Sequence, residues 1–210
     1  MEQSNLSILR KCKQVIVHPS DLFEAVKDER GLGPAFQYLA IISLVIVAGS
    51  VAWMLFLPDL HDFVPSEFLE TIPLESLLSG VGLIIGIPIY IVTLLVSFIV
   101  AGWFHIFAKL FRGKGDYSAT YKAYVYASTP SLLFSWIPIA GTVMGLYSIY
   151  LTILGLSKLH DMSLARAFGI LIAPFVIIIA VVIAVVIYAV IFSGIDFGEL
   201  IPALDKIQQI

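Results

Sequence analysis

The sequence predicts an all-α integral membrane protein with five transmembrane helices, of which two form a tight hairpin. Two observations carry this prediction. Of the 210 residues, 60% are hydrophobic and only 13% are charged, whereas soluble domains have about 45–50% apolar and about 25% charged residues. In addition, Lys, Arg, Asp and Glu are absent from four runs that reach or exceed the roughly 20 residues needed to cross hydrocarbon: 36 to 58, 76 to 108, 123 to 157 and 167 to 195.

Residues 1 to 35 precede the first apolar run and are predicted to form a cytoplasmic amphiphilic segment at the membrane interface. Pro19 can start a short helix, and residues 31 to 34, which contain two glycines and a proline, can end it. The acidic residues of that helix face away from its apolar side, as expected at a membrane interface. The apolar side consists of Leu22, Phe23 and Val26. A solvated or frayed terminus is the alternative interpretation.

The first predicted span covers residues 36–57 and ends before Pro58. The stretch from 59 to 75 has five acidic residues and no Lys or Arg, which indicates an exterior loop. The run from 76 to 108 would be about 50 Å long as one helix, more than the bilayer core of about 30 Å requires. Such a helix must tilt, break or protrude, and we expect a break near Pro88 and the glycines before it, with the span itself at 86–109.

The third run is also too long for one span, and the segment from Pro138 to Gly141 lies in its middle as a turn signal. The sequence therefore predicts a hairpin of two helices, 119–137 and 141–157, whose arms either cross the membrane or re-enter it. The last span is predicted at 165–192. The membrane domain then covers 36–193, and residues 194–210 form an exterior tail.

The basic residues predict the orientation. Eleven of the twelve Lys and Arg residues fall on one side of the predicted spans. Because basic residues near span ends stay in the cytoplasm, the amino terminus is expected inside and the carboxyl terminus outside. Three basic residues before the hairpin are the candidate cytoplasmic contact surface for a protein or an anionic lipid: Lys109, Arg112 and Lys114.

Two stripes at helical spacing mark the hairpin. The first arm carries six hydroxyl side chains on one face: Tyr117, Tyr121, Tyr124, Ser128, Ser131 and Ser135. The second arm carries small residues: Gly141, Gly145, Ser148, Thr152 and Gly155. Small residues let membrane helices approach closely and hydroxyls bond across the contact, so the two stripes are predicted to face each other as a packing seam. The alternative is a polar pathway for an ion or a lipid headgroup.

No catalytic, cofactor-binding or metal-binding site is predicted. The only cysteine is Cys12, which excludes an internal disulfide or a thiolate cluster, and a net charge of -3 argues against a general nucleic-acid binder. His105 is the only histidine within a predicted span and is expected to be packed or interfacial. The GxGD pattern that ends at Asp116 occurs in intramembrane aspartyl proteases, but that chemistry needs two carboxylates, and Asp161 is the only other candidate near a span end on that side.

From Gly113 onward the sequence carries a set of specific features: Tyr126-Ala127 before Pro130, the turn from Pro138 to Gly141, Tyr147, the Leu154-Gly155-Leu156 segment, His160 and the Ser163-x-x-Arg166-Ala167 segment. In these features it resembles the Yip1 domain of prokaryotic Yip1-family membrane proteins. His18-Pro19-x-x-x-Phe23 is also similar to the segment before the first span of this family. The resemblance implies five spans and a cytoplasmic amino terminus. Eukaryotic relatives are linked to Rab GTPases and vesicle traffic, but through a much longer amino-terminal region, and the resemblance supplies no catalytic residues.

The sequence therefore predicts a non-enzymatic multi-pass protein of the cell membrane that acts as an adaptor or scaffold. Its expected partners are the lipid bilayer and membrane or cytoplasmic proteins or anionic lipids, with a homo-oligomer left open. The alternative function is a small transporter or lipid-handling protein that uses the hydroxyl stripe of the third helix.

Overall fold

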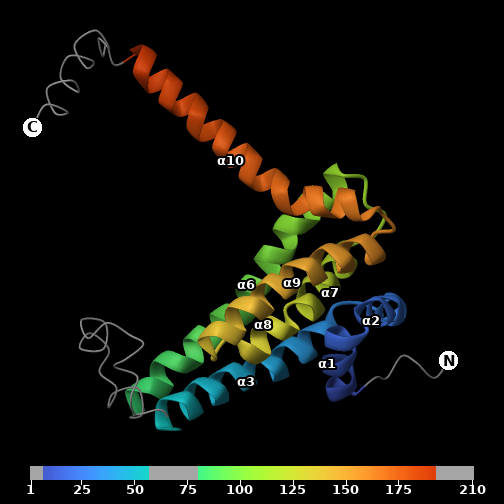
Figure 1. Ribbon diagram of the computed structural model, residues 1–210, viewed down its shortest axis with the longest axis vertical. Coiled ribbons are helices and arrows are strands. Elements are labelled where there is room, and N and C mark those ends of the chain that lie inside the picture. Colours follow the sequence, from blue (N-terminus) through green and yellow to red (C-terminus); the bar gives the residue numbers. More distant parts are fainter. Residues whose placement is uncertain (1–6, 57–79, 193–210) are drawn as a thin grey trace, which may run out of the picture. The chain divides into compact units, whose positions relative to one another are not determined.

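The computed structural model describes residues 7–56 and 80–192, and every regular element in these ranges is a helix (Figure 1). The predicted exterior loop and the predicted tail lie outside these residues. The chain divides into two units, Met1–Ile170 and Leu171–Ile210.

The amino-terminal segment forms α1 (Ile8–Val17), α2 (Pro19–Ala25) and a 3-10 turn, η1 (Val26–Asp28). Ser7 caps α1 by accepting a hydrogen bond from the Arg10 N–H at 3.4 Å, and Pro19 occupies the first turn of α2, where a missing N–H costs nothing. The frayed-terminus alternative is therefore wrong for residues 8–28.

The apolar side predicted for α2 is fully buried, with Leu22 and Phe23 0% exposed and Val26 1% exposed. The sequence predicted that this face would lie at the membrane interface. In the structure it packs against α9 (Pro138–Leu159). Apolar periodicity identifies the buried face of a helix but not the surface that covers it.

Three helices are long and apolar enough to cross a membrane among the residues that the structure describes: Tyr90–Leu110 within α6 (Gly80–Leu110), Ile139–Leu159 within α9, and α10 (Leu164–Phe192). A fourth long helix, α3 (Gly33–Phe56), includes the shorter apolar stretch Gly33–Val45. All four long helices coincide within a few residues with predicted spans, except at the start of α6.

The predicted break near Pro88 is wrong, because α6 continues from Gly80 through Pro88 to Leu110. A proline removes one backbone hydrogen bond from a helix, but membrane helices tolerate this because local adjustments and neighbouring groups satisfy the freed carbonyl. Residues 80 to 110 therefore form one helix that is longer than a single span requires.

The first arm of the hairpin is two helices and not the single helix predicted over 119–137. These are α7 (Tyr117–Ala127) and α8 (Thr129–Phe134), which meet at Ser128. Pro130 cannot donate to the Tyr126 carbonyl four residues earlier, and the Thr129 hydroxyl donates to that carbonyl at 2.7 Å. Thr129-Pro130 is thus a break whose lost backbone hydrogen bond is replaced by a side chain.

The turn between the arms lies at 135–137, three residues before the predicted position, because Pro138 is the first residue of α9. Proline suits that position since its fixed φ is helical and its missing N–H has no partner there anyway. Gly141 allows the close approach of the two arms, because a Cβ at this residue would lie 3.0 Å from both the Phe134 carbonyl oxygen and the Ser135 Cα.

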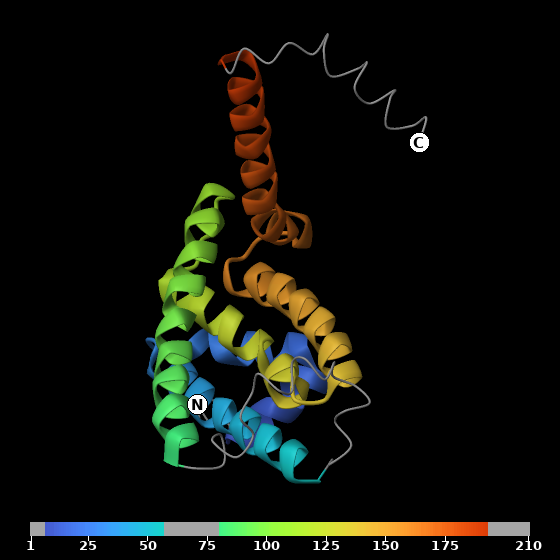
Figure 2. The same ribbon diagram turned by 90° about the vertical axis from the view of Figure 1, so that its left-hand side faces the viewer.

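Within the first unit, α7 packs against both α6 and α9, and α8 packs against both α3 and α9 (Figures 1 and 2). Tyr38 on α3, Tyr121 and Tyr126 on α7, and Leu151 on α9 are among its largest fully buried side chains. The α10 residues of the second unit form a single helix whose apolar side chains are exposed all around, as expected for a helix surrounded by lipid.

Candidate functional site

The loop between α6 and α7, residues 111–116, is held closely against the end of α9. A Cβ at Gly115 would lie 2.6 Å from the Leu159 carbonyl oxygen, and one at Gly113 would lie 2.7 Å from the His160 Nδ1. The Lys114 N–H donates to the His160 carbonyl at 3.0 Å. The two glycines of the GxGD pattern therefore permit a backbone contact between the two ends of the hairpin.

Both ends of this loop are fixed by side chains. Asp116 is the N-cap of α7 and accepts a hydrogen bond from the Ala119 N–H at 2.9 Å. Lys109 reaches across the loop and donates to the Gly115 carbonyl at 2.7 Å. The only carboxylate of the GxGD pattern thus has a structural role in capping a helix, and Asp161 forms an ion pair with Lys27 at 2.8 Å.

Of the three predicted contact residues, Arg112 and Lys114 are exposed at this loop, whereas the Lys109 ammonium is occupied by loop carbonyls. Arg112 adopts a left-handed φ of 62°. The loop is therefore a preorganised turn that presents two basic side chains to solvent.

His105 and His160 are joined through Thr120, a connection that the sequence did not predict. The Thr120 hydroxyl lies 2.8 Å from the His105 Nδ1 and 2.8 Å from the His160 Nε2. A hydroxyl has one proton, so it donates to one ring and accepts from the other. Because an unpaired buried N–H is rarer than an unpaired acceptor, and His160 Nδ1 has no partner among the described residues, we assign the His160 proton to Nε2.

His160 lies at the C-cap of α9, is 0% exposed, and is held in its neutral form. Burial, which is the largest cause, lowers the pKa of His160 together with the neighbouring His105 and Lys109, to about 4 in all.

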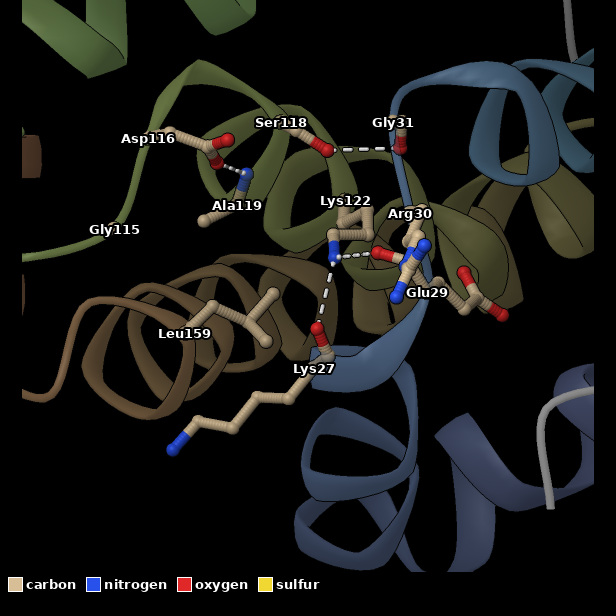
Figure 3. A pocket seen from close by; sticks show the side chains of 10 residues that line it. All are labelled: Lys27, Glu29, Arg30, Gly31, Gly115, Asp116, Ser118, Ala119, Lys122 and Leu159. Atoms are coloured by element: carbon tan, nitrogen blue, oxygen red, sulfur yellow. Dashed lines mark hydrogen bonds between the residues drawn. The ribbon is translucent and has the colours of Figure 1, made fainter. Parts of the chain in front are cut away.

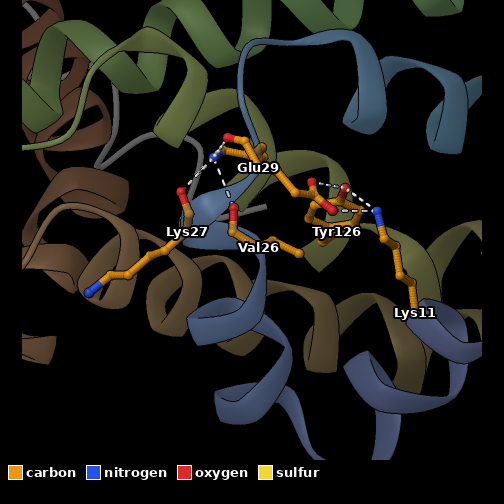
Figure 4. Close-up of polar contacts among 6 residues, drawn as sticks. Lys11, Val26, Lys27, Glu29 and Tyr126 are labelled. Atoms are coloured by element: carbon orange, nitrogen blue, oxygen red, sulfur yellow. Dashed lines mark hydrogen bonds and ion pairs between the residues drawn. The ribbon is translucent and has the colours of Figure 1, made fainter. Parts of the chain in front are cut away.

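A second polar cluster fixes the amino-terminal segment to α7 (Figure 4). The Lys11 ammonium forms an ion pair with Glu29 and donates to the Tyr126 hydroxyl at 3.0 Å, and Tyr126 donates to the other Glu29 oxygen at 2.7 Å. The Lys11 and Glu29 side chains are 8% and 5% exposed. We call these three residues the Lys11–Glu29–Tyr126 cluster.

Lys122, also on α7, is buried beside this cluster. Its ammonium donates to the carbonyls of Val26 and Glu29, both at 2.9 Å, and to that of Lys27 at 3.4 Å. The Val26 carbonyl also accepts the Glu29 N–H at 3.2 Å, and all three carbonyls lie at the end of η1, where helical carbonyls run out of backbone partners. Lys122 therefore acts as a cap for the carboxyl end of the α2–η1 segment.

Exposed ion pairs connect the same segment to the end of α9. Lys158 pairs with Glu24 at 3.0 Å, and Lys27 pairs with both Glu24 and Asp161. The Lys27 ammonium lowers the pKa of the Asp161 carboxyl, and the Lys158 ammonium lowers that of the Glu24 carboxyl. Exposed pairs of this kind contribute little stability, about 0–1 kcal/mol each.

The tyrosines of the predicted hydroxyl stripe face α6 and not α9. Tyr117 donates to the Phe98 carbonyl at 2.8 Å, and the Tyr121 hydroxyl lies 3.1 Å from that of Ser97. The Tyr124 ring packs near Phe104, also on α6, with 6.2 Å between centroids. The prediction that this stripe faces the glycines is therefore wrong for the tyrosines, because helical spacing defines a common face without defining its neighbour.

The serines of the stripe have separate environments. Ser128 donates to the Tyr124 carbonyl of its own helix at 2.8 Å, and Ser135 is exposed. Ser131 is hydrogen-bonded to the second arm, where its N–H donates to the Ser148 hydroxyl at 3.1 Å, and the Ser135 backbone lies against Gly141. That N–H belongs to the first turn of α8 and has no acceptor within its own helix, so Ser148 supplies one.

The glycines of the second arm also differ. Gly155 is a tight contact, because a Cβ there would lie 2.7 Å from the Phe23 ring and 3.2 Å from the Ala123 Cβ. A Cβ at Gly145 would meet no atom within 4 Å. The prediction that Gly145 lies at a contact between the two arms is therefore wrong. Thr152 donates to the Ser148 carbonyl of its own helix.

The residues shared with the family pattern are structural in this fold. Tyr126 belongs to the Lys11–Glu29–Tyr126 cluster, Pro130 marks the break between α7 and α8, and Pro138 starts α9. Gly141 permits the turn, and the Tyr147 hydroxyl donates to the Ile16 carbonyl at 2.9 Å, which connects α9 to the end of α1.

The described residues contain no group of three or more His, Cys, Asp or Glu side chains that could hold a metal ion. The long apolar helices, the exposed apolar surface of α10 and the polar end of the hairpin define a multi-pass helical membrane protein. The Yip1 domain model matches residues 13–192, and the chain therefore belongs to the Yip1 domain family. No curated protein and no solved structure matches the chain.

Proposed function

We propose that this protein is a non-enzymatic adaptor or scaffold of the cell membrane that binds proteins or anionic lipids at its cytoplasmic face. The observation that carries the proposal is the fixed loop at 111–116, which holds Arg112 and Lys114 exposed while Lys109 and Asp116 stabilise its backbone. A surface whose conformation is fixed before binding loses less entropy on association. Its positive charge would favour an anionic partner.

The proposal includes five membrane segments, counting both arms of the hairpin, with the amino terminus in the cytoplasm and the carboxyl terminus outside. It is supported by the distribution of Lys and Arg and by the hydrogen bond between Lys114 and His160. Because that bond joins the two ends of the hairpin, the hairpin returns to the side from which it starts. The sidedness of α10 then does not depend on how deeply the two arms enter the membrane.

Thiol labelling of intact cells tests this orientation. In a Cys12→Ser background, Asp62→Cys and Asp205→Cys are expected to react with an impermeant thiol reagent added outside, whereas Lys114→Cys is expected to react only after the cells are opened. Reaction of Lys114→Cys in intact cells, without reaction of Asp62→Cys, would reverse the orientation.

Exchange of the two exposed basic residues tests the adaptor function. Arg112→Gln combined with Lys114→Gln should weaken association with an anionic partner on the order of 30-fold, since each basic residue near such a surface contributes about 1 kcal/mol. The measurement is quantitative recovery of co-purifying proteins and lipids from native membranes in mild detergent.

The matched control for this test is Lys13→Gln combined with Arg166→Gln, which removes the same charge from other exposed positions. It should leave recovery unchanged. An unaltered set of partners for the loop variant, or equal losses in both double variants, would contradict a specific contact at this loop.

A further inference from the structure

A pocket of about 400 Å³ opens beside the polar end of the hairpin (Figure 3). Its walls come from the segment after η1, which includes Arg30, from the first turns of α7, which include Ser118 and Lys122, and from Leu159 at the end of α9. This volume is within the range of about 300–1,000 Å³ that is typical of small-ligand sites.

The pocket is lined by three cationic side chains, Lys27, Arg30 and Lys122, and by two acidic residues. The Glu29 carboxylate, however, is occupied by Lys11 and Tyr126, and it points away from the pocket (Figures 3 and 4). The Asp116 carboxylate is occupied in capping α7. Lys27 is balanced by its ion pairs with Glu24 and Asp161. Arg30 and Lys122 are therefore the cationic groups of the pocket that form no ion pair with a described carboxylate.

Lys122 gives this pocket a fixed positive charge. Its side chain is buried, and its ammonium is held by three backbone carbonyls with no carboxylate within ion-pair distance among the described residues. Charge in a partly buried position acts over longer distances than charge in water, because the local dielectric constant is lower. An anion in the adjoining space would be attracted by it.

Arg30 supplies the group that can bind such an anion directly. It is exposed at the pocket and forms no ion pair with any residue that the structure describes. A guanidinium presents parallel N–H groups that match the oxygens of a phosphate, and it is preferred over an ammonium where both oxygens are bound.

We propose that this pocket binds a phosphate group, carried by the headgroup of an anionic phospholipid or by a small phosphate compound. The walls of the pocket are the carboxyl end of the candidate span Ile139–Leu159, the start of α7 and the residues just before α3, which lie where lipid headgroups are expected. This inference rests on the proposed role of the cytoplasmic face in binding partners, and it specifies a phosphate group as the ligand. Lipid retention by the purified chain tests it without any protein partner.

The test uses the full-length protein purified in detergent and mixed with phosphatidylcholine that contains a small fraction of phosphatidic acid. Retained lipid is measured for the wild type, for Arg30→Gln and for Arg30→Lys. Arg30→Gln should weaken phosphatidic acid retention about tenfold, equivalent to about 1.4 kcal/mol. Arg30→Lys keeps the positive charge but loses the parallel N–H groups of the guanidinium, so it should give an intermediate value.

Arg166→Gln is the matched control, because it removes an exposed arginine that does not line the pocket. It should retain phosphatidic acid within about twofold of the wild type, by the small effect expected of a remote exposed charge. Equal retention by Arg30→Gln and the wild type, or equal losses in Arg30→Gln and Arg166→Gln, would overturn the proposal while leaving the result for the Arg112 and Lys114 double variant unaffected.

Addition of inorganic phosphate separates the two sources of the ligand. Competition at millimolar concentration would assign the site to phosphate itself, and retention that depends on Arg30 but resists phosphate would assign it to the lipid. Both results support the proposed chemistry. Retention of phosphatidylcholine and phosphatidic acid to the same extent would contradict it.

Discussion

Replacement of Glu29 by glutamine is expected to lower the free energy of unfolding by about 3–5 kcal/mol, the usual cost of breaking a buried ion pair from one side. Glu29 and Lys11 are both almost fully buried, so the change leaves an ammonium without its counter-charge in a region of low dielectric constant. Tyr126 would also lose a charged acceptor. Chemical or thermal unfolding of the detergent-solubilised protein measures the effect.

Glu24→Gln is the matched control for this change. Glu24 forms ion pairs with Lys158 and Lys27, but its side chain is 50% exposed, so the expected loss is below about 1 kcal/mol. Lys11→Met combined with Glu29→Gln should recover part of the stability lost in Glu29→Gln, because the ammonium that Glu29→Gln leaves without a counter-charge is then also removed. Similar losses for Glu29→Gln and Glu24→Gln would show that burial of the pair has no energetic consequence.

The Lys11–Glu29–Tyr126 cluster is one of several contacts that make the amino-terminal segment part of the helix bundle. Phe23 packs against Gly155 on α9, Lys122 caps the end of η1, and Glu29 joins α1 to α7. Apolar burial and polar contacts therefore hold the same segment from two sides.

The positions of the long helices were predictable from the sequence because each lies mostly within an apolar run without charged residues that is long enough to cross the hydrocarbon core of a bilayer. The break within the first arm was not predicted, although Pro130 is its signal, because membrane helices often continue through proline. Pro88 and Pro130 show both outcomes in one chain: α6 continues, and the first arm is divided. The neighbouring hydroxyl of Thr129 distinguishes the second case by replacing the lost bond.

The candidate site was predictable only where its residues are close in sequence. Arg112 and Lys114 were recognised from local charge, and Asp116 from the turn pattern. The contacts between Lys11 and Tyr126, or between His105 and His160 through Thr120, join residues far apart in the chain, and the sequence of a single chain contains no periodic signal for such pairs. Helical spacing indicates a shared face, but the tertiary arrangement decides which helix that face meets.

His160 is expected to make the protein lose stability as the pH falls from about 6.5 to about 4. The pKa of histidine in an unfolded chain is about 6.5, whereas burial lowers the pKa of His160 in the folded protein to about 4. Between these values the unfolded chain binds more protons than the folded one, so protonation favours unfolding. Above the pKa of the unfolded chain, His160 does not reduce the free energy of unfolding. Once the pH is below the pKa of the folded protein, the free energy of unfolding is lower by about 3 kcal/mol.

The measurement is the free energy of unfolding in detergent from pH 7.5 to pH 4.5, compared between the wild type and His160→Gln. Glutamine cannot titrate, and its amide can take the place of Nε2 toward the Thr120 hydroxyl, so the variant should show a smaller decrease over this range. His18→Gln, at an exposed histidine at the start of α2, is the control for the exchange of a histidine by glutamine. Parallel pH profiles for the wild type and His160→Gln would show that His160 is not held neutral by burial.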